Sequence, residues 1–334
     1  MQLMMIFFIS VVIIGGACRA DGHDFVIIKS HLTGEMNSMI SIVENLEQPY
    51  AIAETTELWS RDEVPRFIFH ALGNEDEIKE LSEYKRNYPN VKIINLHDPL
   101  SKYEIFDLIL KSNQISNLRG SNVFGYDGIP SQVTPEKLKK GASLLTLIPE
   151  NPSVENVAVL IGGDAKGSQF TSQHAILLAR NLNKIRKNQN VRFLIADSRR
   201  TSAHARKSFF SVFDEKDLDI FFPWEKVTPN ANPFFGILEV SKYLIVTGDS
   251  MSMISDCIST GKPTFVYAPD GSLEERHKRF VLSHFKSGRL KPLASTLEVY
   301  KYSPFNAVKT IASKIVNKYR NYFSRSLQCK QFYW

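Results

Sequence analysis

The stretch Val157-Ala158-Val159-Leu160-Ile161-Gly162-Gly163 decides the fold of this chain. A short β-branched run that ends in glycines and precedes a long amphipathic stretch is typical of a βα unit. The same alternation extends outward in both directions, back to Phe25 and on to Tyr267. Repeated βα units build parallel sheets with helices on their faces, so the sequence predicts an α/β fold.

Two series of strands are expected, separated by a linker with Pro149 and Pro152 in residues 148–152. The first series is residues 25–29, 67–70, 91–95, 106–110 and 143–147, and the second is 157–161, 191–196, 218–221, 243–247 and 264–267. The predicted architecture is two tandem Rossmann-like domains, a class that commonly binds ligands in a cleft at the carboxyl ends of its strands. The predicted boundaries are 23–150 and 151–298, preceded by an apolar segment at 1–22 and followed by a basic amphipathic helix and tail at 299–334.

Composition supports this reading. A length of 334 residues suits two ordinary domains, and 43% hydrophobic with 23% charged residues excludes collagen-like, coiled-coil and wholly disordered chains. The formal charge of +6 permits an anionic partner. Three widely spaced cysteines form neither a disulfide framework nor a metal-ligand pattern, and a reducing compartment is the simpler interpretation.

The first eighteen residues carry no charged side chain. A cleaved signal peptide, a lipoprotein site at Cys18, a single membrane anchor and a buried first strand are all open interpretations. A signal or an anchor is favoured, and residues 1–22 are therefore left out of the fold argument. Arg19 and Lys29 after the uncharged start favour a membrane-associated protein whose domains face the cytoplasm.

Two loops after predicted strands suit an anion. Gly162 and Gly163 let backbone N–H groups approach closely, and Lys166 adds a positive charge, although a plain tight turn explains two glycines equally well. The next strand ends in Ser198, Arg199, Arg200 and Thr201. Paired guanidiniums flanked by hydroxyls suit a diphosphate, and the alternative is a solvated basic turn.

A third loop follows the strand at 243–247 and supplies four further candidates, Thr247, Asp249, Ser250 and Ser252. Asp249 or Ser250 would cap a helix whose N-terminal N–H groups form an anion site. Asn232, before the next helix, could hold a base or sugar ring, or simply begin that helix. Three such loops at the carboxyl ends of one sheet together predict a donor-phosphate site.

The catalytic candidates come from the first predicted domain, where Glu35 and His31 follow the first strand. Either could serve as a general base facing the inter-domain cleft. The histidines show no ligand spacing, so no metal site and no cofactor are expected.

Several motifs in order resemble the mitochondrial-fission family of the elongated-mitochondria (ELM) type. The motifs of the second half are Gly162-Gly163, Ser198-Arg199-Arg200-Thr201, Asn232-Pro233-Phe234-Phe235-Gly236, Val246-Thr247-Gly248-Asp249-Ser250-Met251-Ser252-Met253-Ile254-Ser255 and Thr260-Gly261-Lys262-Pro263. Those of the first half are His97-Asp98-Pro99, Phe106-Asp107-Leu108, Gly120-Ser121-Asn122-Val123 and Val133-Thr134-Pro135-Glu136-Lys137-Leu138. The resemblance covers nearly all of residues 25–298.

This resemblance implies a GT-B-like fold. In nucleotide-sugar glycosyltransferases of this fold, the second domain holds the donor diphosphate. It implies either a metal-independent glycosyltransferase acting on a membrane-linked acceptor or a non-catalytic membrane adaptor that recruits a protein partner. Two positions depart from the family pattern. Asp164 stands where proline is usual, and the opening Gly34-Glu35-Met36-Asn37-Ser38 lacks the usual histidine.

The charge of the chain is concentrated at its end. Residues 300–334 contain seven Lys and Arg and no acidic residue, which leaves 34 basic and 35 acidic residues elsewhere. Apolar residues recur there at helical spacing, which predicts an amphipathic helix. The helix could pack back on the first domain, attach to an anionic membrane surface, or do both, and a nucleic-acid partner is not expected.

Overall fold

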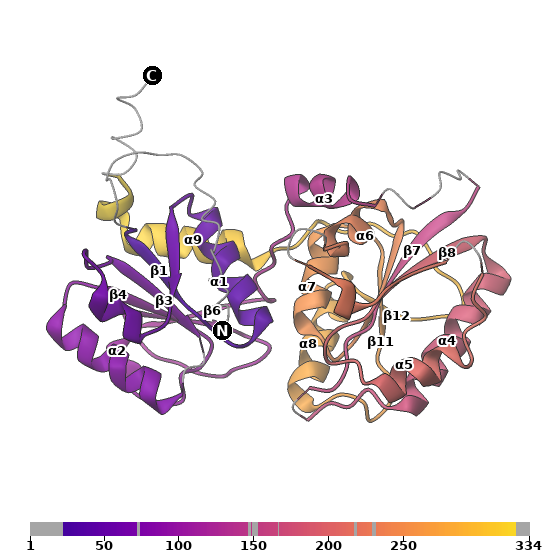
Figure 1. Cartoon of the computed structure of the whole chain (residues 1–334), viewed down its shortest axis with the longest axis horizontal. Coiled ribbons are helices and arrows are strands. Elements are labelled where there is room, and N and C mark those ends of the chain that lie inside the picture. The colour runs from indigo at the N-terminus through magenta and orange to yellow at the C-terminus, as the bar shows by residue number, and fades with distance from the viewer. Residues whose placement is uncertain are drawn as a thin grey trace, which may run out of the picture. The chain divides into compact units, whose positions relative to one another are not determined.

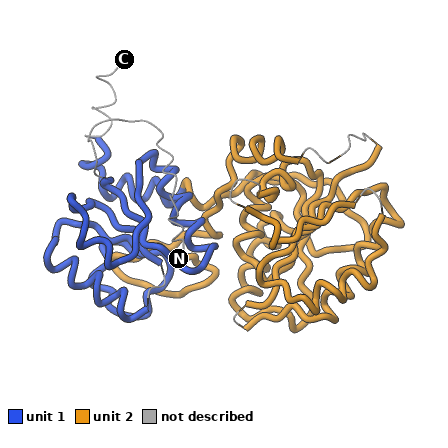
Figure 2. Tube along the Cα trace, in the orientation of Figure 1, with its two compact units in different colours: residues 1–109, 310–334 blue, residues 110–309 orange. Residues whose placement is uncertain are grey.

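The computed structural model describes residues 23–71, 74–145, 148, 153–165, 167–216, 219–228 and 232–324. The chain forms two compact units, which Figure 2 colours separately. Within the described chain, the first unit contains the residues up to Ile109 and those from Thr310 onward, and the second contains Leu110–Lys309. Each unit is described by itself below.

The second unit contains a six-stranded sheet in the order β9-β8-β7-β10-β11-β12. Its strands are β7 (Glu155–Leu160), β8 (Val191–Ala196), β9 (Ile220–Phe222), β10 (Tyr243–Thr247), β11 (Thr264–Tyr267) and β12 (Lys291–Pro292). Every neighbouring pair is parallel. In chain order this is the arrangement 3-2-1-4-5-6 of Rossmann folds, whose strand order reverses between β7 and β10.

Helices cover both faces of this sheet (Figure 1). Val157, Val159 and Ile161 enter one core with α4 (Ser172–Asn188) and α5 (Ala203–Phe210). Ala158 and Leu160 enter the other core with α6 (Phe234–Val240), α7 (Met251–Ser259) and α8 (Glu275–Lys286). The continuous apolar sequence of β7 is therefore explained by burial on both faces, as in other parallel sheets.

The first sheet has the order β2-β1-β3-β4-β5-β6. Its strands are β1 (Phe25–Ile28), β2 (Tyr50–Ala53), β3 (Phe67–Ala71), β4 (Lys92–Leu96), β5 (Leu108–Ser112) and β6 (Val123–Tyr126), and the boundary between the compact units falls within β5. Strand β1 pairs in parallel with β2 and β3, and β3 pairs in parallel with β4. Helices α1 (Thr33–Asn45) and α2 (Glu75–Asn87) follow β1 and β3, so the chain order reverses between these two strands.

The last helix, α9 (Ala307–Lys318), runs into the first unit, where Ile311 and Ile315 are buried. Figure 1 shows it in yellow. The ring centroids of Tyr322 and Phe67 lie 5.0 Å apart, and those of Phe323 and Phe25 lie 6.3 Å apart. The apolar stripe of the C-terminal segment therefore packs on the first sheet.

The α/β class, the two Rossmann-like sheets and the C-terminal helix are confirmed. The strand expected at 143–147 is wrong for its described residues, because α3 (Pro135–Ala142) ends in a turn in which the Ser143 N–H donates to Lys139 O at 3.2 Å. Leu145 instead packs beside the second core. Strands β2, β6 and β12 were not expected. The apolar segment at 1–22 and nearly all of the proposed linker lie outside the described residues, so the domain boundaries stay predictions.

Candidate functional site

Three loops meet at the carboxyl edge of the second sheet, where the strand order reverses between β7 and β10. Ligands of open α/β sheets bind at such a reversal. The Gly162 N–H donates to Thr247 Oγ1 at 2.8 Å, and the Gly163 N–H donates to Asp249 Oδ2 at 2.8 Å. The loops after β7 and β10 are thus joined directly, and both N–H groups already have acceptors inside the protein.

Both glycines are required by close packing. A Cβ on Gly162 would lie 2.0 Å from the Asp249 carboxylate, and a Cβ on Gly163 would lie 2.0 Å from the Arg200 carbonyl oxygen. Such distances are far inside van der Waals contact. The tight turn that the sequence left open as an alternative is therefore present. Because Gly162 and Gly163 have no Cβ, the neighbouring loops can pack closely against them.

The loop after β8 joins the same network. Ser198 Oγ donates to Gly162 O at 2.8 Å, and Thr201 Oγ1 also donates to that carbonyl. The Asp164 N–H in turn donates to Arg200 O at 3.2 Å. The Ser198–Thr201 loop is therefore held against the glycine turn by hydrogen bonds in both directions.

The two arginines of this loop differ. Arg200 Nη2 lies 3.1 Å from Asp249 Oδ2, and its Nη1 donates to the carbonyls of Gly163 at 3.2 Å and Asp164 at 3.1 Å. The Arg200 guanidinium therefore braces the three loops together. The side chain of Arg199 is exposed and has no ion-pair or hydrogen-bond partner among the described residues, so it is the arginine of this pair that is open to an external anion.

The N-terminus of α7 supplies polar groups beside this network. Ser250 stands at the N-cap position but makes no capping hydrogen bond, and its hydroxyl lies 3.5 Å from that of Ser252. Because the first N–H groups of a helix have no partner within it, a helix that lacks a side-chain cap presents them, with a partial positive charge, to other acceptors. Two hydroxyls and these N–H groups form an arrangement suited to phosphate.

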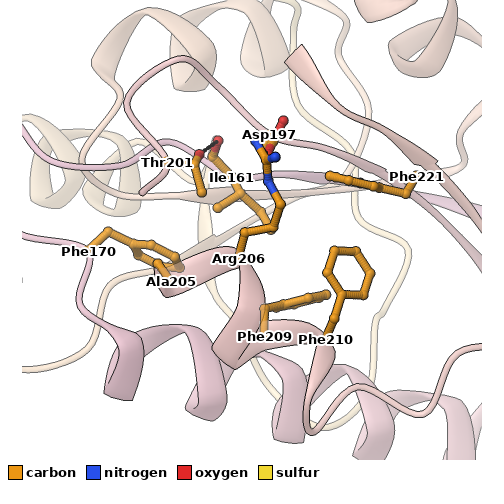
Figure 3. Close-up of a pocket in the computed structure, with 9 residues that line it drawn as sticks. All are labelled: Ile161, Phe170, Asp197, Thr201, Ala205, Arg206, Phe209, Phe210 and Phe221. Atoms are coloured by element: carbon orange, nitrogen blue, oxygen red, sulfur yellow. Dashed lines mark hydrogen bonds and ion pairs between the residues drawn. The ribbon is translucent and has the colours of Figure 1, made fainter. Parts of the chain in front are cut away.

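A small cavity of about 10 Å³ lies next to the β8 loop (Figure 3). Arg206 Nε donates to Asp197 Oδ2 at 2.6 Å, and the Trp224 N–H donates to Asp197 Oδ1 at 2.8 Å. Burial raises the pKa of the Asp197 carboxyl. A cavity of this size holds at most about one water, so its ion pair serves to fix the loop that begins at Ser198.

A further group, not anticipated from the sequence, lies beside the bridge that pairs Ala165 with Ser168. Ser168 Oγ lies 3.3 Å from His277 Nδ1, which is 3.2 Å from Glu274 Oε1. Burial lowers the pKa of His277. These residues fix the start of α8 against Ser168. Lys166, a predicted phosphate ligand, lies outside the described residues.

Asn232 occupies a different position from that of the three loops. Its side chain is exposed, and its Oδ1 accepts a hydrogen bond from the Phe234 N–H at 3.0 Å. Among the described residues, no hydrogen bond joins it to the three-loop network. This hydrogen bond helps to fix the start of α6, and the contact of Asn232 with a base or sugar stays a prediction.

The first sheet carries polar residues where its own strand order reverses, between β1 and β3. Glu35, in the first turn of α1, is buried, and Ser30 Oγ donates to its Oε2 at 2.7 Å. Burial raises the pKa of the Glu35 carboxyl. A carboxylate with a raised pKa is suited to accept a proton. His31, the other candidate base, is exposed.

His70 lies near Glu35, and both His70 and its partner Asn95 were missed by the sequence analysis. They are paired across β3 and β4, and His70 Nδ1 lies 2.6 Å from Asn95 Oδ1. Asn95 Nδ2 donates to His97 O at 3.0 Å, so Oδ1 is the acceptor and His70 carries a proton on Nδ1. His70 Nε2 lies 3.5 Å from Glu77 Oε2, and this contact holds the pKa of the Glu77 carboxyl below its usual value.

Among the described residues, no group of three or more His, Cys, Asp and Glu side chains is placed to hold a metal ion. None of the described helices combines the length and the apolar character needed to cross a membrane.

Two Rossmann-type sheets in one chain and a last helix that joins the first unit define a GT-B-like α/β protein. Residues 15–319 match the family described as Mitochondrial fission ELM1. The chain belongs to this family. An uncharacterised protein of Rickettsia prowazekii (strain Madrid E) is 29% identical over 342 residues, which cover 88% of this chain and 94% of that protein.

Solved structures support the same fold. The UDP-GlcNAc 2-epimerase of Neisseria meningitidis, bound to UDP-GlcNAc, is 11% identical with a TM-score of 0.51, over 90% of this chain and 93% of that one. The UDP-GlcNAc 2-epimerase of Methanocaldococcus jannaschii is 8% identical with a TM-score of 0.50, over 88% and 99%. At such low identity these similarities establish the fold and leave the activity open.

Proposed function

We propose that the second unit binds the diphosphate of a nucleotide sugar and that the chain transfers the sugar to a membrane-linked acceptor. One observation carries this proposal: the uncapped N-terminus of α7, with Ser250 and Ser252, begins where the strand order reverses. That position is the ligand site of open α/β sheets, and its chemistry suits a diphosphate. The UDP-GlcNAc bound to the Neisseria protein of similar fold supports this class of ligand.

Each loop has a distinct part in this proposal. The hydroxyls of Ser250 and Ser252 and the first N–H groups of α7 hold the phosphates. Arg199, exposed in the β8 loop, adds a guanidinium that can donate two parallel hydrogen bonds. Arg200 and Asp249 keep the loops in place through their ion pair. Lys166 and Asn232 stay predictions as further ligands of the donor.

In the proposed reaction, Glu35 accepts the proton of an acceptor hydroxyl, whose oxygen bonds to the anomeric carbon of the sugar. The bond from that carbon to the diphosphate breaks, and the nucleoside diphosphate leaves with the electron pair. Donors placed at Ser250 and Ser252 would stabilise the charge that develops on this leaving group. The raised pKa of Glu35 suits its part as the base, and His31 is the alternative base.

A second function is a non-catalytic adaptor that recruits a protein partner at a membrane. The observation in its favour is that Asp249 already occupies the Gly163 N–H and the Arg200 guanidinium, two groups that the sequence analysis assigned to the donor. In both proposals the chain is membrane-associated, with its two units on the cytoplasmic side, where nucleotide sugars are made. The mass of the mature protein tests this location, because cleavage of residues 1–22 would indicate export.

A thermal-shift screen against nucleoside diphosphates and nucleotide sugars separates the two functions. Binding to the folded state raises the melting temperature, so the transferase proposal requires stabilisation by at least one of these ligands. Arg199→Ala should weaken that stabilisation, whereas Arg180→Ala, which removes an exposed charge from α4, should not. If no ligand stabilises the protein, the transferase proposal fails and the adaptor remains.

A further inference from the structure

A groove of about 710 Å³ lies at the amino edge of the first sheet, against the chain that follows α9. Arg66 and Lys92, at the beginnings of β3 and β4, line one side, and Lys318 and Arg320 line the other. The rings of Tyr319 and Tyr322 and three asparagine side chains also line it. The volume is in the range of sites for small molecules.

The cations of the groove fall into two kinds. Arg66 is paired with Asp24 at 3.4 Å, and Lys92 is paired with Asp107 at 3.3 Å. Lys318 and Arg320 have no carboxylate partner among the described residues. The Lys318 ammonium lies 5.9 Å from the centre of the Tyr319 ring, and Arg320 Nη2 donates to Asn317 Oδ1 at 3.3 Å. The side of the groove formed by the C-terminal segment therefore carries uncompensated positive charge.

Further positively charged residues lie beyond the groove. Lys309 and Lys314 are exposed on α9, and residues 300–324 contain no Asp or Glu. A single phosphate compound in the groove would not require this extension, whereas a surface of negative headgroups would be attracted to all of it. Tyr319 and Tyr322 add amphipathic rings, which are enriched at the level of lipid headgroups.

We propose that this groove binds the phosphate of an anionic phospholipid headgroup and holds the first unit against an anionic membrane surface. The groove lies at the amino ends of β3 and β4, whereas Glu35 and His70 lie at carboxyl ends of the same sheet. Lipid binding at the groove therefore leaves the proposed catalytic residues of this sheet uncovered. The inference does not depend on the transferase activity and holds equally for the adaptor.

The test is co-sedimentation of the full chain with vesicles of phosphatidylcholine alone and with an equal share of phosphatidylglycerol. The anionic vesicles should bind more tightly, and raised salt should weaken the difference. Lys318→Gln with Arg320→Gln should reduce binding to the anionic vesicles by about 25-fold, from about fivefold for each charge near a membrane. Arg180→Gln with Lys184→Gln removes two exposed charges from α4 and should leave binding unchanged.

Three results would overturn the proposal. Equal binding to both kinds of vesicle would assign attachment to an apolar segment. If the Lys318 and Arg320 variant bound anionic vesicles with unchanged affinity and kept its circular dichroism spectrum, the groove would not be the lipid-binding site. If soluble glycerol phosphate bound as tightly as the vesicles and was lost in the same variant, the groove would be a site for a free phosphate compound. Should that variant unfold, Arg320→Gln alone carries the test, with about a fivefold loss expected.

Discussion

At the scale of single residues, Asp249 determines how the candidate donor site is organised. Its carboxylate is buried and binds the Gly163 N–H and the Arg200 guanidinium, the groups that an incoming phosphate would otherwise use. The sequence predicts that a bound phosphate supplies the negative charge at these groups. In the structure the Asp249 carboxylate already supplies it. This leaves Arg199, Ser250 and Ser252 for an external anion.

Gly163 is the residue in which this packing is least tolerant of change. Gly163→Ala would place a Cβ 2.0 Å from a backbone oxygen, which cannot rotate away, so we expect a loss of about 3 kcal/mol in the free energy of unfolding. Gly271→Ala is the control, because its φ of +77° is strained but no atom lies within 4 Å of the new Cβ. It should cost about 1 kcal/mol. Urea denaturation compares them, and equal losses would contradict the close packing.

His284 should make stability depend on pH. Neither of its ring nitrogens has a hydrogen-bond partner in the described protein, and burial lowers its pKa from 6.5 to about 4. Because the unfolded state takes up the proton first, stability is full above pH 6.5 and falls as the pH drops toward 4. The loss attributable to His284 at pH 4 is about 3 kcal/mol.

The measurement is the stability of the parent and of His284→Phe across this range. The comparison is needed because Asp256, whose pKa burial raises to about 7, acts in the opposite direction and stabilises the folded state as the pH falls. Subtracting the two curves isolates the histidine. If the two proteins lost stability in parallel, the imidazole would not be held neutral in the core.

At the scale of elements, the chain after α9 secures the first sheet. Phe323 is buried against Phe25 of β1, so Phe323→Ala should cost about 3 kcal/mol and accelerate amide exchange in β1 and β3. Strands β7 and β8 belong to the second unit and should be unaffected. Val316→Ala, on the exposed face of α9, is the control and should change stability by less than about 0.5 kcal/mol. Equal acceleration in β7 would contradict this assignment.

Elements with a strong local signal were predicted well from the sequence. Strands β8, β10 and β11 have the expected bounds, because each is a run of mostly aliphatic and aromatic residues buried on both faces, in which β8 also buries Arg192. Strand β12 has only two residues, and β2 and β6 include small or partly exposed residues, so they give no such run. The sequence at 143–147 contains three leucines, but its described residues 143–145 follow α3 in a turn, and Gly141 of that helix packs against Gly236.

The site was predicted in part for a similar reason. Loops that follow neighbouring parallel strands meet at one edge, so Gly162, Ser198 and Thr247 could be placed together from the sequence. The pairing of His70 with Asn95 joins residues 25 positions apart, and no motif marks it. The internal partner of Gly163 depends on which way the Asp249 side chain turns, which sequence spacing does not determine.

At the scale of the whole molecule, the fold places one polar cluster at the point of strand-order reversal in each sheet. One contains the uncapped N-terminus of α7, and the other contains Glu35 beside His70. A diphosphate site and a proton acceptor are the two requirements of glycosyl transfer to a hydroxyl. The central claim is therefore that the first of these clusters binds a nucleoside diphosphate.

The most direct measurement is the change in backbone amide chemical shifts on titration with UDP, with ADP and GDP in parallel. We predict that one of them shifts the amides of residues 250–253 and of Arg199. Ser250→Ala with Ser252→Ala should weaken its affinity about 150-fold, because each hydroxyl bond to a charged group contributes about 1.5 kcal/mol. Ser211→Ala should bind normally. Amides 250–253 that stay unmoved by all three nucleotides, or shifts confined to the groove of Arg66 and Lys318, would contradict the claim.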